Sequence, residues 1–223
     1  MVRGGKGCLG ACGCSEVRPG VIQSPDGTYV VRLALPPGFI KTEILRTVAE
    51  LAERYASGEV HITVRQGLEI PEVPPSKLDD LLRNLRKLGL EPGSTGPRVR
   101  QVTCCPGIRT CANALMDPVP LAQKLHEEFV DVWVPAKVKI AVSGCPRGCT
   151  RPSENDLGLV AVSEDEWELL VGGYRVTRLP ERDVIDAVES TLEWYSSEAP
   201  PGMRLRRFVT DRVSELRDVL ERL

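Results

Sequence analysis

The chain has 223 residues, 42% of them apolar and 27% charged, which is enough to bury one large or two small hydrophobic cores. Its formal net charge of −2 argues against a nucleic-acid binder that relies on phosphate contacts. No run of about 18 uncharged apolar residues occurs, and the N-terminal MVRGGKG lacks the apolar stretch of a secretory signal. We therefore expect a cytoplasmic protein that binds neither nucleic acid nor a membrane.

The first part of the chain alternates between strand-like and helix-like patterns. Residues 1–20 are rich in glycine and cysteine and lack periodicity, so we expect an irregular arm there. A strand, an amphipathic helix, a β-rich run broken at Gly67 and a second amphipathic helix follow, and each helix ends in glycine. This β-α-β-β-α order predicts a small sheet covered on one face by two helices, within residues 21–92. The four predicted elements occupy residues 28–36, 41–58, 60–70 and 76–89.

The second part of the chain, residues 93–223, has a mixed α/β pattern that follows the linker-like EPGSTGPR. Its first predicted helix has Pro106 in the first turn, and its first predicted strand is the apolar VKIAVSG. A β-hairpin and two C-terminal helices complete the pattern. In chain order, the predicted helix, strand, hairpin and two helices occupy residues 106–116, 138–144, 156–173, 181–196 and 206–222.

Four of the eight cysteines form two pairs, Cys105-x5-Cys111 and Cys145-x3-Cys149. In a reducing compartment, clustered cysteines more often bind metal or carry out redox chemistry than form disulfides. Zinc is one candidate, but the five-residue gap of the first pair is long for a zinc knuckle. An iron–sulfur cubane accepts wider spacing because each thiolate holds a different iron. The spacing favours a cubane and leaves zinc as an alternative.

Positive charge accompanies these cysteines. Between residues 96 and 151 there are eight Lys or Arg and four Asp or Glu, a local balance of +4 in an acidic chain. Lys137 and Lys139 are two residues apart in an expected strand, so both should point to one face, and Arg98 and Arg100 repeat the spacing ahead of Cys105. Solvated lysines on an edge strand are the alternative. The position of both pairs predicts a site for an oxyanion or a polyanion.

The pattern C-x5-C followed by SGCPRGC resembles the sirohaem and [4Fe-4S] signature of the sulfite and nitrite reductases. The segments HITVRQGLEI, GPRVRQVTCCPG, VPAKVKIAVSG and DLGLVAVSEDEWELLVGGYRV are also similar to that family, most of all to its small, single-module, assimilatory-type sulfite reductases. The resemblance implies an α+β fold, with a ferredoxin-like half domain over residues 21–92 and an α/β domain for sirohaem and the cluster over residues 93–223.

The resemblance also implies roles for individual residues. Cluster ligands would be Cys105, Cys111, Cys145 and Cys149. Cys149 would in addition bridge the cluster to the sirohaem iron, and Arg98 and Arg151 would neutralise sirohaem carboxylates. The substrate anion would be bound by Arg65, Arg100, Lys137 and Lys139. The implied partners are sulfite or nitrite and a low-potential electron donor such as ferredoxin, and the chain would act as a monomer or a self-paired dimer.

Several alternatives stay open at this level. The function that the resemblance implies first is the six-electron reduction of sulfite to sulfide. Lys139 favours sulfite as the substrate, because nitrite enzymes of the family tend to have asparagine at this position. The alternative functions are nitrite reduction to ammonia and a non-catalytic subunit that carries sirohaem or electrons. Cys104 is expected to be a buried core residue. His61 and His126 are expected in packing or surface positions. The roles of Cys8, Cys12 and Cys14 are unassigned.

Overall fold

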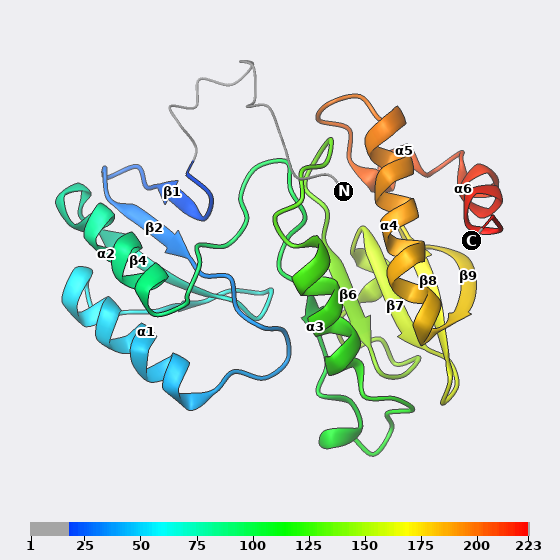
Figure 1. The fold of residues 1–223 in the computed structure, drawn as a ribbon, viewed down its shortest axis with the longest axis horizontal. Coiled ribbons are helices and arrows are strands. Elements are labelled where there is room, and N and C mark those ends of the chain that lie inside the picture. Colours follow the sequence, from blue (N-terminus) through cyan, green and yellow to red (C-terminus); the bar gives the residue numbers. More distant parts are fainter. Residues whose placement is uncertain (1–17, 223) are drawn as a thin grey trace.

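A computed structural model of the protein describes residues 18–222 and contains two β-sheets side by side, each with its own helices (Figure 1). The expected α+β class is confirmed. Each sheet has a separate hydrophobic core. No helix within the described part of the chain is both long and apolar enough to cross a membrane. Because residues 1–17 lie outside that part, the predicted arm and Cys8, Cys12 and Cys14 are not placed.

The first sheet is antiparallel throughout, with the strand order β1-β2-β4-β3. Its helices are amphipathic, and apolar residues three or four apart, such as Leu78, Leu81, Leu82 and Leu85, pack onto the sheet. Along β2 the alternation sends Val31 into this core. The elements are β1 (Val21–Gln23), β2 (Tyr29–Arg32), α1 (Thr42–Tyr55), β3 (His61–Ile62), β4 (Leu68–Val73) and α2 (Pro75–Lys87).

Two features of the first sheet differ from the sequence-based prediction. Strand β1 was not predicted, because its three residues are largely exposed and too few to show an alternating pattern. The β-rich run is a hairpin whose tight turn contains Thr63, Arg65 and Gln66; Gln66 has a φ of 60°, in the left-handed region. Arg65 therefore lies in a turn rather than in a strand.

The second sheet has the strand order β5-β6-β7-β8-β9. Strands β5, β6 and β7 are parallel, whereas β7, β8 and β9 are antiparallel, which confirms the predicted hairpin. Helices α3 and α4 cover one face of this sheet (Figure 1). The elements are β5 (Thr103–Cys104), α3 (Pro118–Phe129), β6 (Ile140–Ser143), β7 (Leu157–Ala161), β8 (Glu166–Val171), β9 (Tyr174–Pro180), α4 (Glu181–Glu198), α5 (Leu205–Phe208) and α6 (Val213–Leu220).

The prediction of a helix over residues 106–116 is wrong. Only a short 3-10 turn, η1 (Gly107–Arg109), forms there, because Gly107 adopts a φ of 60° that is incompatible with an α-helix. The segment continues as a loop as far as Asp117. The carboxylate of Asp117 caps α3 by accepting a hydrogen bond from Val119 N at 3.1 Å. Helix α3 was not predicted.

The C-terminal helices and the linker also depart from expectation. Helix α4 is confirmed, but the helix expected over residues 206–222 is divided into α5 and α6. The break covers residues 209–212 and ends at Arg212, which has a non-helical φ of −126° and ψ of 18° and contacts the rings of Trp194 and Phe208. The linker packs against the first sheet, where Gly93 N donates to Arg32 O at 2.8 Å. A second 3-10 turn, η2 (Pro152–Glu154), precedes β7.

Candidate functional site

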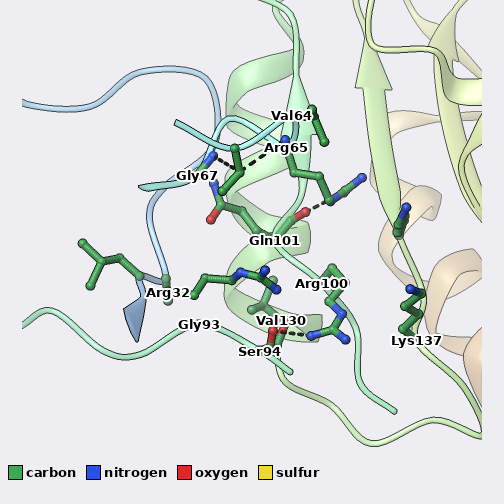
Figure 2. Close-up of a pocket in the computed structure, with 14 residues that line it drawn as sticks. Arg32, Val64, Arg65, Gly67, Gly93, Ser94, Arg100, Gln101, Val130 and Lys137 are labelled. Atoms are coloured by element: carbon green, nitrogen blue, oxygen red, sulfur yellow. Dashed lines mark hydrogen bonds between the residues drawn. The ribbon is translucent and has the colours of Figure 1, made fainter. Parts of the chain in front are cut away.

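A cavity of about 230 Å³ lies where the two sheets meet, and positive side chains line it (Figure 2). The four cations assigned to the substrate anion all reach this cavity, and a fifth cation joins them. Among the described residues, no carboxylate lines it. A small anion is the ligand that such a lining favours. The five cations are Arg32, Arg65, Arg100, Lys137 and Lys139.

Lys137 and Lys139 line the cavity together because the residue between them is buried. Val138 is fully buried and pairs with Val99 in an isolated parallel bridge, so the side chains on either side of it point the other way. Strand β6 begins only at Ile140. The extended segment nevertheless gives the alternation expected of a strand.

Arg65 connects the two halves of the protein. From the β3–β4 turn its guanidinium donates to Asn155 Oδ1 at 2.8 Å, to Gln101 O at 2.6 Å and to Ile140 O at 3.0 Å. Its Nε is buried and has no hydrogen-bond partner among residues 18–222. Burial lowers the pKa of Arg65 to about 10, so the side chain is still charged at neutral pH.

Arg100 and Arg32 are each held by hydrogen bonds to neighbouring residues. Arg100 donates to the carbonyls of Ser94 and Gly96, and burial, followed by the nearby Arg32, lowers its pKa. Arg32 donates from Nε to Glu69 Oε1 at 2.7 Å. Sequence reasoning missed Arg32, although it is the one charged residue in the apolar run YVVRLALP. A single charge within an apolar run was the sequence signal that could have identified Arg32 as a site residue.

Lys139 differs from the other cations in its electrostatic surroundings. Burial lowers its pKa, the positive charges of Arg65, Lys137 and Arg204 lower it further, and Asp156 opposes the shift. No hydrogen bond or ion pair to its ammonium occurs among residues 18–222. Lys139 is therefore a free donor that releases a proton more readily than an ordinary lysine.

A buried carboxylate lies behind this lysine and was also missed. Asp156, whose side chain is 3% exposed, accepts from Lys139 N at 2.9 Å and from Arg204 Nη2 at 2.7 and 2.8 Å. The pair joins the segment that carries Lys139 to the region before α5. Sequence separation explains why the pair was not predicted, since Asp156 and Arg204 are 48 positions apart in the chain.

We expect Asp156→Ala to lower the free energy of unfolding by about 2–4 kcal/mol, because it leaves Arg204 and the Lys139 amide without their acceptor. Urea unfolding followed by circular dichroism measures this. The control Asp211→Ala removes an exposed carboxylate and should change stability by less than about 0.5 kcal/mol. Equal midpoints for the two variants would refute the stabilising role of the pair.

A second cavity, of about 690 Å³, adjoins the first and connects it to the cysteines. The two cavities share Val64, Arg65 and Lys139 in their linings. Cys105 and Cys149, one from each pair, line the second cavity. Arg151 also lines it, from a left-handed backbone position with a φ of 53°. The first cavity, called the anion cavity below, is thus separated from the cavity of Cys105 and Cys149 only by residues that line both.

The two cysteine loops pack against each other through glycines. A Cβ at Gly144 would lie 2.6 Å from Met116 O, and one at Gly107 would lie 2.1 Å from Pro118 Cδ, so neither position has room for a side chain. Gly144 N donates to Cys105 Sγ at 3.2 Å, and Gly144 O accepts from Leu115 N at 2.7 Å. The close contact brings the loop of Cys105 and Cys111 against the loop of Cys145 and Cys149.

The arrangement of the thiols bears on which metal group fits. Nowhere in the described residues do three Cys, His, Asp or Glu side chains converge closely enough to hold a single metal ion. A tetrahedral zinc site gathers all its ligands on one ion, whereas a cubane binds each thiolate through a different iron. An amide already donates to Cys105 Sγ, as it would to a cluster thiolate. The four thiols, two on each of two packed loops, fit an iron–sulfur cluster.

Two other residues considered from the sequence lie elsewhere. Cys104 is 1% exposed in the core of the second sheet, and burial raises the pKa of its thiol to about 12. Arg98 lines neither cavity; its guanidinium pairs with Asp131 and lies 4.2 Å from the centre of the Trp133 ring. Arg98 therefore does not line the cavity with Arg100, although its charge is close enough to lower the pKa of Arg100.

The sequence and the fold both have relatives. Residues 95–221 match the family described as nitrite and sulphite reductase 4Fe-4S domain, and residues 22–88 match the nitrite/sulfite reductase ferredoxin-like half domain. An uncharacterized protein of Methanocaldococcus jannaschii is 47% identical over 65% of this chain and 51% of its own length. The coenzyme F420-dependent sulfite reductase of that organism is 38% identical over 64% of this chain and 23% of its own length.

A third relative, an assimilatory-type sulfite reductase of Nitratidesulfovibrio vulgaris, is 27% identical over 87% of this chain and 92% of its own length. The chain thus spans about half, or less, of the first two relatives and nearly all of the third. The crystal structure of dissimilatory sulfite reductase I aligns with a TM-score of 0.79 over 95% of this chain and 75% of that chain, at 15% identity, and so shares the fold. The predicted succession of a ferredoxin-like half domain and a 4Fe-4S domain is confirmed.

Proposed function

The chain belongs to the nitrite and sulphite reductase family, and from this we propose that it reduces sulfite to sulfide with a sirohaem coupled to a [4Fe-4S] cluster. One observation carries the proposal. A cavity lined by five cations shares Arg65 and Lys139 with the cavity that Cys105 and Cys149 line. An anion held by the cations would then lie beside the thiol-bound redox group.

The proposal assigns the cofactors to residues whose chemistry suits them. The cluster would be held by Cys105, Cys111, Cys145 and Cys149, with Cys149 shared with the sirohaem iron. Arg151, exposed in the larger cavity, would pair with sirohaem carboxylates. When bound, the coupled pair supplies the six electrons that the reduction consumes, one at a time. The division into residues 21–92 and 93–223 belongs to the same proposal and is supported by the two separate cores.

The side chains of the anion cavity would bind sulfite and supply protons. Removal of three sulfite oxygens as water consumes protons repeatedly, so the site needs donors that can be refilled. The arginines stay charged and hold the anion, while Lys139, with its lowered pKa, gives a proton to a departing oxygen. Lys137, beside it in the same cavity, adds positive charge that favours the build-up of electrons on the substrate.

Sulfite is preferred over nitrite because Lys139 faces the cavity and because two of the relatives are named sulfite reductases. The electron donor would be a low-potential protein such as ferredoxin, and the protein would work in the reducing cytoplasm as a monomer or a self-paired dimer. Nitrite reduction uses the same cavity. A carrier of sirohaem or electrons without catalysis is the remaining alternative.

Spectra and product analysis test the proposal. Protein purified without oxygen should show the Soret and visible bands of sirohaem, shift them on addition of sulfite, and form sulfide when a reduced low-potential donor is supplied. Electron uptake without sulfide would favour the carrier, and faster formation of ammonia from nitrite would favour nitrite as the substrate. A colourless, iron-free protein that contains zinc would refute the proposal.

A further inference from the structure

Three charged or titratable residues form a row across the first sheet. Glu69 in the central strand β4 pairs in register with Arg32 of β2 on one side and with His61 of β3 on the other. Glu69 Oε1 accepts from Arg32 Nε at 2.7 Å and lies 2.6 Å from Arg32 Nη2, and Glu69 Oε2 is 2.8 Å from His61 Nδ1. Each carboxylate oxygen thus faces one neighbour in the row.

The row connects the anion cavity to solvent. On the opposite face of the sheet, Val31 and Ile70 pack against the helices in the core. Arg32 lines the anion cavity, the Glu69 side chain is 8% exposed, and the His61 side chain is 62% exposed. The buried carboxylate therefore separates a cavity cation from a histidine that water reaches.

The charges around the row are few and can be named. Among residues 18–222, the groups that interact with the Glu69 carboxylate are Arg32 and, charged only when protonated, His61, one from each flanking strand. Burial would raise the Glu69 pKa, but the hydrogen bonds from His61 and Arg32 outweigh it and hold that pKa below its usual value. On the cavity side, Arg65 and Arg100 are close enough to Arg32 for the charges to interact. Glu69 is therefore ionised at neutral pH and contacts one arginine, Arg32, whose charge acts on the other two.

Glycine fixes the path of the Arg32 side chain. A Cβ at Gly93 would lie 3.1 Å from Arg32 Cγ, so the linker backbone packs directly on the arginine stem. Together with the two contacts to Glu69, this packing leaves the guanidinium one position at the cavity wall. The position of Arg32 depends on Glu69, and the net charge of the row depends on His61.

Resting on the proposed function, we propose that Glu69 is a positioning residue that holds Arg32 at the anion cavity, and that His61 sets how much of the Glu69 charge Arg32 receives. With neutral His61, the carboxylate cancels the charge of Arg32. A protonated His61 interacts with the same carboxylate as Arg32, so less of the negative charge of Glu69 compensates Arg32 and the net charge of the row is higher by one. Since histidine changes charge between about pH 5 and 8, affinity for an anion should rise as pH falls through this range.

Calorimetric titration of the cofactor-loaded protein with nitrite tests the proposal, because nitrite remains an anion across the range and binding is measured without turnover. When the pH is lowered from roughly 8 to roughly 6, the nitrite affinity of the wild-type protein should rise about two- to fivefold more than that of His61→Gln. When Glu69→Gln is already present and Arg32 is retained, the additional His61→Gln change should no longer alter how nitrite affinity depends on pH. The control His126→Gln, in α3 and away from the cavity, should show the same affinity ratio to wild type at both pH values.

Two results would overturn the proposal. Equal dissociation constants for wild type and His61→Gln at both pH values would show that His61 does not act on the cavity. A pH effect that persists in the Glu69→Gln background would show that His61 acts through space rather than through the Glu69 contact. If wild type binds neither nitrite nor sulfite, the proposed function itself fails, which separates that failure from the other two.

Discussion

Cys105→Ala is expected to remove the iron–sulfur cluster, whereas Cys104→Ala, one residue earlier, is expected to leave the iron content unchanged. Cys105 lines the larger cavity, where its Sγ accepts a hydrogen bond from Gly144 N. Cys104 is buried, and a Cβ at Gly38 would lie 2.8 Å from its Sγ, so the core leaves its thiol no room to turn towards the cavity. Iron analysis and the visible spectrum of protein purified without oxygen measure the difference.

The neighbouring position makes Cys104 a close control. Its replacement loses a small buried side chain, so a decrease in stability of about 1 kcal/mol is expected with the cluster in place. Equal iron in wild type and Cys105→Ala would remove Cys105 from the ligand set. Iron loss in Cys104→Ala, in a protein that still unfolds cooperatively, would contradict the assignment of Cys104 to the core rather than to the cluster.

Lys139→Ala is expected to slow sulfite reduction about 100-fold or more while the sirohaem bands remain. The change removes a cation with no competing partner in the described part of the protein and leaves its backbone bond to Asp156 intact. Steady-state assays for sulfide, with a reduced low-potential donor, give the rate. Lys124→Ala, on the exposed side of α3, is the matched control and should keep the wild-type rate.

Lys139→Arg separates charge from proton release. Arginine keeps the positive charge but does not deprotonate in proteins, so kcat should fall with a smaller change in KM. The pH profile should change too. Wild-type activity should decline as pH rises through the lowered pKa of Lys139, because the donor is then deprotonated, and this decline should be absent from the remaining activity of Lys139→Arg. Wild-type kcat in either variant would refute the assignment.

The sequence indicated much of this site because its chemistry is local. The cysteine spacing pointed to the two loops, and the Lys137, Lys139 alternation pointed to one shared face, which Val138 then provides by its burial. Composition and helical spacing gave a wrong prediction at residues 106–116. Pro106 suggested the start of a helix, but the positive φ of Gly107 prevents an α-helix from forming. A loop in this place still brings Cys105 to the cavity.

Other parts of the site depend on contacts between distant segments. Arg32 and Glu69 are 37 residues apart, and Arg65 and Asn155 are 90 residues apart. No pattern within one strand or helix predicts these pairs, because they form only when one sheet is assembled or when two sheets meet. The buried Asp156 and Arg204 pair was missed for the same reason.

The three hydrogen bonds of Arg65 have a consequence for dissecting the protein. A fragment that begins at residue 95 would contain every cysteine assigned to the cluster and both lysines, yet Gln101 O, Ile140 O and Asn155 Oδ1 would each lose the hydrogen bond from Arg65. Two of the three cavity arginines would be missing as well. On the proposed function, we expect such a fragment to acquire iron but fail to retain an oxyanion, so metal loading and substrate capture would be separable, and only the second would require the ferredoxin-like half.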